Sequence, residues 1–369
     1  MLKLGTWEDF VKSIESGKKV ACIGTGNRFN EIIKFPKGEN VVKNIRYVVD
    51  NSIGKQGHIC KMGEKQWRIM GPEQLIKTDM DNIIILITIA NGYYDVIEQL
   101  KALNIRENVD IYCLTHMKAV LDEKSALKKE IPNNIKLSEV MLIPKKIHYC
   151  WFGGKPIPDK YKIWMESWKK YCPDYEIIEW NESNYDIRKN EYMYEAYKMK
   201  KWGFVPDYAR LDIIYNHGGI YLDTDVELVS NIDDLLYQEA FVGFESIDHV
   251  NFGSGFGAAK GNPVIKRLRD DYDNIKFEFS EKSTGLEPSP VIQTRLLKKF
   301  GLKCDGEYQV LNNIVIYPEK MFCGKSLSSK RIMLKPYTRA IHHYDGSWLD
   351  EELRKKISES ERDLNTILR

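Results

Sequence analysis

Two carboxylates in the middle of the chain are the residues best placed to do chemistry. Asp223 and Asp225 stand two positions apart, directly after the apolar residues Ile220, Tyr221 and Leu222. At the period of a β-strand, such a pair projects to one face. Two carboxylates held together repel each other unless a cation neutralises them, and oxygen ligands suit Mg²⁺ or Mn²⁺. The pattern therefore predicts a site for Mn²⁺ or Mg²⁺ at the edge of a sheet.

The residues before the aspartates predict a capped helix. Pro206 can open this helix, Asp207 suits its first turn, and Arg210 follows on the same face. Gly218 and Gly219 supply a stop, after which the strand begins. Asp207 and Arg210 can serve the site, or they can have the purely structural role of a dipole partner and a solvated cation.

Three separated blocks together resemble glycosyltransferase family 32. This Asp-x-Asp family includes capsular polysaccharide transferases, Och-type mannosyltransferases and, more distantly, the glucosylating clostridial toxins. The blocks stand in the family's order, at residues 143–158, 207–225 and 340–348. The resemblance implies a hexosyltransferase that moves a sugar from a nucleotide-diphosphate sugar, UDP-linked, to a glycan or lipid-linked glycan acceptor. It further implies retention of anomeric configuration and a role in bacterial capsular or surface polysaccharide synthesis.

The family pattern assigns roles to four catalytic candidates: Asp207, Arg210, Asp223 and Asp225. Asp225 is the leading metal ligand, and Asp223 either binds the metal or contacts ribose and sugar hydroxyls. The Asp207 carboxylate would accept hydrogen bonds from donor sugar hydroxyls, and the planar Arg210 guanidinium would contact sugar or diphosphate. On this basis, Arg210→Lys should lower activity while the melting temperature barely moves.

Four further residues enter through the same resemblance. His343 is a candidate third metal ligand, and Ser347 competes with it for that role. Trp151 is expected to stack on the nucleobase. Ser347 and Trp348 are expected to contact the donor, with Trp348 on a loop that closes over it. Ordinary packing is the alternative for each aromatic residue and histidine.

Composition narrows the class of protein. With 369 residues the chain exceeds one hydrophobic core, and its net charge of +2 argues against nucleic acid as a partner. The seven cysteines are odd in number and form no Cys-x-x-Cys pair, which favours reduced thiols in a cytosolic protein. The apolar runs are too short to span a bilayer, and the N-terminus lacks a signal-peptide pattern. We therefore expect a cytoplasmic protein without a transmembrane segment, which leaves peripheral association with the inner face of the plasma membrane open.

The fold is expected to be α/β, with two domains. An N-terminal Rossmann-like, doubly wound domain should span residues 1–130, and an A-type (GT-A) glycosyltransferase domain should span 141–369, with the linker at about 121–140. In the first domain, strands are expected at 19–23, 44–49, 82–89 and 110–114. In the second, strands are expected at 145–151, 175–180, 240–245 and 254–259, and helices at 160–171, 192–201, 263–272 and 291–299. The last 20 residues should form a charged, packed helix.

A partial dinucleotide-binding pattern lies in the first domain. Gly24-x-Gly26 follows the first strand and Asp50 follows the second, but the third glycine of the fingerprint is missing. We favour a structural or partner-docking module over a working oxidoreductase.

Two other functions fit the Asp-x-Asp. A haloacid-dehalogenase-type sugar-phosphate hydrolase would need Thr or Val two residues after the second aspartate, where this chain has Glu227. A non-catalytic nucleotide-sugar- or polysaccharide-binding protein would bind a donor without hydrolysing it. Metal-dependent hydrolysis of the donor separates the binding protein from the transferase.

Overall fold

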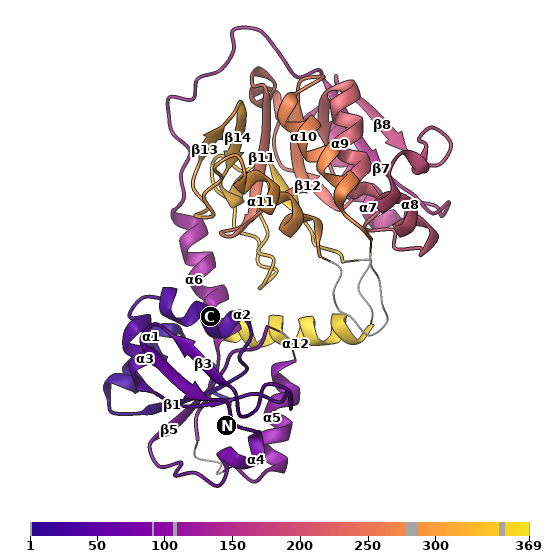
Figure 1. The fold of residues 1–369 in the computed structure, drawn as a ribbon. Coiled ribbons are helices and arrows are strands. Elements are labelled where there is room, and N and C mark those ends of the chain that lie inside the picture. Colours follow the sequence, from indigo (N-terminus) through magenta and orange to yellow (C-terminus); the bar gives the residue numbers. More distant parts are fainter. Residues whose placement is uncertain (1, 91, 106–108, 278–286, 347–350, 369) are drawn as a thin grey trace. The chain divides into compact units, whose positions relative to one another are not determined.

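The computed structural model describes residues 2–90, 92–105, 109–277, 287–346 and 351–368 (Figure 1). The chain forms two compact units. Unit 1 comprises Met1–Glu123 together with Asp350–Arg369, and unit 2 comprises Lys124–Leu349. Both units are mixed α/β structures. No helix in the described ranges is long and apolar enough to cross a bilayer.

Unit 1 is built on a parallel sheet of four strands in the order β2-β1-β5-β6. Its inner strand β5 is buried along its whole length, as an uninterrupted Ile-Ile-Ile-Leu-Ile run requires. Separate apolar clusters cover the two faces of the sheet, one beneath α1 and α3 and the other beneath α5. The strands are β1 (Lys19–Ile23), β2 (Ile45–Val49), β5 (Ile83–Ile87) and β6 (Ile111–Cys113), and the helices are α1 (Trp7–Glu15), α2 (Asn27–Glu31), α3 (Gly38–Asn44), α4 (Pro72–Leu75), α5 (Tyr93–Ala102) and α6 (Leu114–Lys128).

The C-terminal helix α12 (Glu351–Ile367) belongs to unit 1, whereas the sequence analysis placed it in a second domain that runs to residue 369. Its Asp363 carboxylate accepts hydrogen bonds from the hydroxyls of Tyr93, at 2.7 Å, and Tyr94. Ser360 lies 3.1 Å from His116, and Leu364 is buried in a small apolar cluster. These polar contacts of α12 are made with residues of α5 and α6, so the charge pattern of α12 alone could not predict to which unit the helix belongs.

Unit 2 is built on a mixed seven-stranded sheet in the order β13-β14-β11-β12-β9-β7-β8. Strands β8, β7 and β9 are mutually parallel, and β12 then runs antiparallel to β9. The strand bounds are β7 (Lys146–Cys150), β8 (Glu176–Trp180), β9 (Gly219–Tyr221), β11 (Ala240–Ser246), β12 (His249–Ala258), β13 (Gln309–Leu311) and β14 (Ile314–Tyr317).

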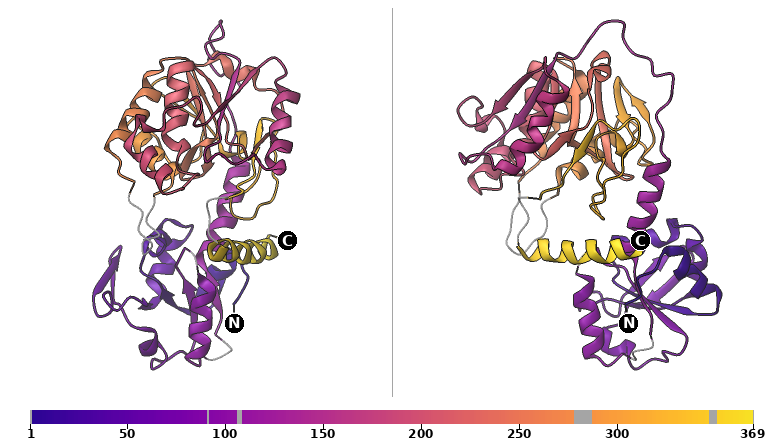
Figure 2. Two further views of the ribbon diagram at one scale, coloured as in Figure 1. Left: turned by 90° about the vertical axis from the view of Figure 1, so that its right-hand side faces the viewer. Right: turned by 180° about the vertical axis from the view of Figure 1, so that it is seen from behind.

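Helices cover both faces of this sheet (Figures 1 and 2). One apolar cluster packs α8, α9, α10 and α11 against it, and a second cluster packs α7 against the opposite face. The helix bounds are α7 (Asp159–Tyr171), α8 (Glu191–Lys198), α9 (Pro206–His217), α10 (Pro263–Asp271) and α11 (Ser289–Lys298), with 3₁₀ turns at η2 (Ile187–Lys189), η3 (Asp233–Tyr237), η4 (Tyr272–Asn274) and η5 (Glu319–Met321).

A small two-stranded ladder brings the C-terminal block to the Asp-x-Asp. Strand β10 (Val226–Leu228) pairs antiparallel with β15 (Ala340–His342), and Val226 lies opposite His342. The ladder continues past β15, because the His343 backbone N–H donates to the Asp225 carbonyl at 2.9 Å. Two segments more than a hundred residues apart therefore meet where the sequence predicts a metal site.

Candidate metal and donor site

The two aspartates lie on a tight turn between β9 and β10, and not on the strand itself. The Asp223 backbone N–H donates to the Gly253 carbonyl at 2.9 Å, and the Val226 N–H donates back to the Asp223 carbonyl at 3.0 Å. Gly253 leaves room for the Asp223 carboxylate in this position, because a Cβ there would lie 2.1 Å from Asp223 Oδ2 and would displace it. The turn and the glycine together set the direction of the Asp223 carboxylate.

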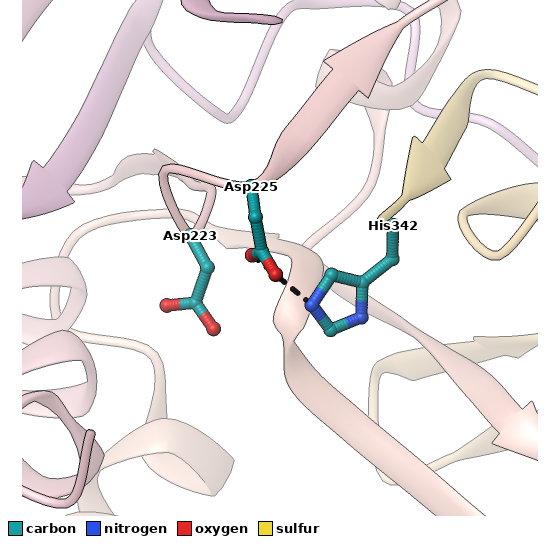
Figure 3. A group of neighbouring side chains, drawn as sticks. All are labelled: Asp223, Asp225 and His342. Carbon is teal, nitrogen blue, oxygen red and sulfur yellow. Dashed lines mark ion pairs between the residues drawn. The ribbon is translucent and has the colours of Figure 1, made fainter. Parts of the chain in front are cut away.

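Asp223, Asp225 and His342 form one cluster of candidate ligands (Figure 3). One ligand atom from each lies within 4.8 Å of the others. The His342 Nε2 is 3.2 Å from Asp225 Oδ1. Burial disfavours the imidazolium, yet the attraction of Asp225 raises the pKa of His342 well above its ordinary value. Burial likewise opposes ionisation of Asp225, but His342 lowers the pKa of that carboxyl to about 2.

This cluster suits a divalent cation. Two carboxylates and one imidazole are a common donor set for Mn²⁺, and they also accept Mg²⁺. The second ring nitrogen of His342, Nδ1, is buried without a hydrogen-bond partner among the described residues. The excess of negative charge is what a cation would relieve.

The histidine that joins the aspartates is His342, whereas the sequence analysis named His343. The His343 Nε2 lies 2.9 Å from Glu227 Oε2, and its ring stacks on Trp164 with centroids 4.1 Å apart. Neighbouring residues of an extended segment point to opposite sides, so the pairing with β10 can bring only one of the two to Asp225. The competing candidate Ser347, together with Trp348, lies outside the described residues.

The Asp207–Arg210 pair lies directly beside Asp223. The Arg210 guanidinium is 3.2 Å from Asp207 Oδ1 and 3.5 Å from Asp223 Oδ1, and its side chain is only 4% exposed. It also lies over the ring of Tyr221, 5.3 Å from the centroid. Burial raises the pKa of Asp207 to about 6, although Arg210 opposes that shift. The alternative of a solvated Arg210 is therefore wrong.

Two tyrosines to which the sequence analysis gave no role in the site complete this network. The Tyr221 hydroxyl donates to Asp223 Oδ1 at 3.0 Å, and the Tyr192 hydroxyl donates to Asp207 Oδ2 at 3.2 Å. Tyr221 stands two residues before Asp223, so the period of a strand could have indicated it. Tyr192 comes from α8 and carries no such signal. Both hydroxyls restrict the rotamers of the carboxylates that they contact.

Asp345 links the C-terminal block to helix α7. Its backbone N–H donates to Asp225 Oδ2 at 3.0 Å. Its carboxylate accepts from Lys160 Nζ at 2.6 Å and from the Tyr161 hydroxyl at 2.5 Å. The sequence analysis missed this residue, although it lies inside the third family block. Asp345 therefore holds an N–H group on a candidate metal ligand.

Trp151 lies at the end of β7, at the edge of the same region. Its indole Nε1 donates to the Lys155 carbonyl at 2.6 Å, and its ring meets that of Tyr161 edge-on with centroids 5.6 Å apart. The residue is partly buried. These contacts fix the orientation of the indole, and Tyr161 connects it through Asp345 to the aspartates.

Comparison with known proteins identifies the class of this region. Residues 158–242 match the family model described as "Glycosyltransferase sugar-binding region containing DXD motif". This segment includes Asp207, Arg210, Asp223 and Asp225. The chain therefore carries a glycosyltransferase region, and the resemblance seen in the sequence is confirmed for this segment.

Individual relatives agree with the family model. Inositol phosphoceramide mannosyltransferase 3 of Schizosaccharomyces pombe is 29% identical over 145 residues, covering 37% of this chain and 39% of that protein. An uncharacterized glycosyltransferase of Acanthamoeba polyphaga mimivirus is 31% identical over 135 residues, covering 34% and 53%. Among solved structures, the PaToxG glycosyltransferase aligns with a TM-score of 0.35 at 21% identity, covering 50% of this chain and 78% of that one. The chain thus spans about half the length, or less, of the yeast and viral relatives.

Proposed function

We propose that the protein is a metal-dependent glycosyltransferase that uses a nucleotide-diphosphate sugar, UDP-linked by resemblance, and retains the anomeric configuration. The observation that carries the proposal is the convergence of Asp223, Asp225 and His342 with the Asp207–Arg210 pair. On this proposal unit 1 is a Rossmann-like domain, and unit 2 is a GT-A domain in which residues 158–242 carry the donor site.

In this proposal Asp225 and His342 hold Mn²⁺ or Mg²⁺, with Asp223 as a further ligand or a hydroxyl acceptor. When bound, the cation would neutralise the diphosphate and stabilise the leaving group. Asp207, ionised at neutral pH with a pKa of about 6, accepts hydrogen bonds from sugar hydroxyls. Arg210 holds the carboxylates of Asp207 and Asp223 in place and can direct its remaining N–H groups to the donor.

The acceptor side of the proposal rests on resemblance and on the names of the relatives. A glycan or a lipid-linked glycan is the acceptor that we propose, in capsular or surface polysaccharide synthesis. A cytoplasmic protein at the inner face of the plasma membrane would meet such an acceptor. Trp151 is the proposed stacking partner of the base, with a fixed indole ring.

The test is a screen of UDP- and GDP-sugars for hydrolysis by the full chain, with EDTA or with Mn²⁺ or Mg²⁺. We expect one donor to be hydrolysed only with metal, and Asp225→Asn to abolish this at an unchanged fold. Asp159→Asn, an exposed aspartate on α7, is the matched control and should keep full activity. Metal-dependent binding of a donor without its hydrolysis would indicate a non-catalytic binding protein. Donor hydrolysis that does not depend on metal would refute the proposed metal site.

A further inference from the structure

A basic segment without a single acidic residue lies next to the third family block. Residues 324–339, named here the basic loop, contain no Asp or Glu and five cations: Lys325, Lys330, Arg331, Lys335 and Arg339. The whole chain is nearly balanced, with 55 basic and 53 acidic residues. The positive charge of this segment is therefore a local feature.

Three apolar side chains project from the basic loop into solvent. Ile332 is 59% exposed, Leu334 51% and Leu327 42%. Single exposed apolar residues are common on protein surfaces. Three within eight positions, flanked by cations, are instead what an interaction site presents.

The backbone of the basic loop holds these side chains outward. Lys325 pairs antiparallel with Ile332, and the Ser326 N–H donates to the Arg331 carbonyl at 2.9 Å. The Ser326 side chain is buried and accepts from the N–H groups of Ser328 and Ser329. The exposure of the apolar residues is therefore built into an ordered turn.

The cations divide into a base and a tip. At the base, Lys335 pairs with Glu130, and Arg339 pairs with Asp234 at 2.8 Å. At the tip, Arg331 is exposed and forms no ion pair within the described part of the chain. Among the described residues, no carboxylate therefore neutralises the positive charge of Arg331 at the tip of the loop.

We infer that the basic loop docks on an anionic lipid surface. Its exposed Leu327, Ile332 and Leu334 would enter the interface between headgroups and acyl chains, while Arg331 and its neighbours meet the negative headgroups. Charge complementarity favours this occupant over a neutral partner. The combination of apolar and cationic side chains also favours it over a purely polar ligand.

The loop also neighbours the candidate site. Lys325 Nζ donates to the His343 carbonyl at 3.3 Å, and Lys330 Nζ lies 4.9 Å from the centroid of the Tyr344 ring. Docking would therefore bring the residues around His342 close to the lipid surface. This consequence rests on the proposed function, since it would present the donor to a lipid-linked acceptor, whereas the docking itself does not depend on any transfer.

The experiment is co-flotation of the full chain with vesicles of phosphatidylcholine alone, or of phosphatidylcholine with roughly 30% phosphatidylglycerol to supply anionic headgroups. We expect binding to the anionic vesicles only, weakened by high salt. Arg331→Ser should weaken it about fivefold, the factor for one cation at an anionic surface. The double variant Ile332→Ser/Leu334→Ser should weaken it by about tenfold or more.

Matched controls are Val310→Ser and Ile163→Ser, which remove apolar side chains of 61% and 66% exposure elsewhere in unit 2. Both should bind vesicles like the wild type. Absence of wild-type binding, equal binding to neutral vesicles, or equal losses in the controls would overturn the inference. So would a concentration-dependent dimer that the double variant disrupts, because the loop would then be an interface between copies. Donor hydrolysis without acceptor should stay unchanged in the double variant, which separates this test from that of the proposed function.

Discussion

Arg210 offers the sharpest test, because the structure changes what its substitution should do. The sequence analysis treated Arg210→Lys as nearly neutral for stability. In the structure the guanidinium is buried and spans Asp207, at 3.2 Å, and Asp223, at 3.5 Å. A lysine ammonium keeps the charge but cannot hold two separated carboxylates with a planar fork. The substitution should therefore affect stability and activity together.

The size of the effect follows from the burial. Removing one partner of a buried ion pair costs about 3–5 kcal/mol, so a change that keeps the charge should cost roughly 2 kcal/mol. For a unit of this size, that lowers the melting temperature by about 4–8 °C. A lost hydrogen bond to a charged group is worth about 1.5–3 kcal/mol, so donor hydrolysis should fall at least about tenfold.

The assay measures thermal unfolding and metal-dependent donor hydrolysis on the same preparations. Arg269→Lys is the matched control. Arg269, on α10, pairs at 3.4 Å with Asp212, which lies on the same helix as Arg210, and it pairs at 2.6 Å with Asp270. It should lose some stability and no activity per folded molecule. If Arg210→Lys has the melting temperature and the donor hydrolysis rate of the wild type, the role assigned to the contacts of Arg210 with Asp207 and Asp223 is wrong. If it loses stability alone, Arg210 is only structural.

Three further predictions concern other residues. Burial lowers the pKa of His148 to about 4, below the usual 6.5, so its contribution to stability is present above about pH 6.5 and is lost as the pH falls. Protonation of His148 should contribute about 2 kcal/mol to the stability lost in urea unfolding between pH 7 and pH 5, and His148→Asn should remove this part of the slope. Asp345→Asn should raise the Mn²⁺ concentration for half-maximal hydrolysis about three- to tenfold, and an unchanged Mn²⁺ titration would leave Asp345 without a positioning role. Asp50 Oδ2 already accepts the Thr25 N–H and hydroxyl, so calorimetric titration with NADH or NADPH should show no binding, and binding with redox turnover would overturn this.

Local patterns were sufficient for most of the secondary structure. Strand Lys19–Ile23 has the expected bounds, and the apolar run around Ile83–Ile87 is a buried parallel strand. The hairpin β3 (Ile59–Met62) and β4 (Lys65–Arg68) was not predicted, because its strands are short and mostly exposed. Without a buried face, the alternation that marks a strand is too weak to read.

The site shows the same division between local and long-range information. The spacing of Asp207, Arg210 and Asp223 was enough to bring them together, since one helix and one strand connect them. The choice between His342 and His343 depends on the register of β15 against β10, which is set by a pairing across more than a hundred residues. Asp345 was missed for a similar reason, because its partners Lys160 and Tyr161 belong to α7.

The charges of the site make the case for a cation without any appeal to resemblance. Asp207 and Asp223 flank the Arg210 guanidinium and Asp225 pairs with His342, so the three carboxylates exceed the one permanent cation of the site by two. A nucleotide diphosphate would add further negative charge to this surplus and would be repelled. The raised pKa of His342 expresses the same field, because Asp225 favours the protonated imidazole, and this proton would have to leave when His342 binds a metal. A divalent cation held by these groups would neutralise this surplus, so donor binding itself, and not only turnover, should require metal.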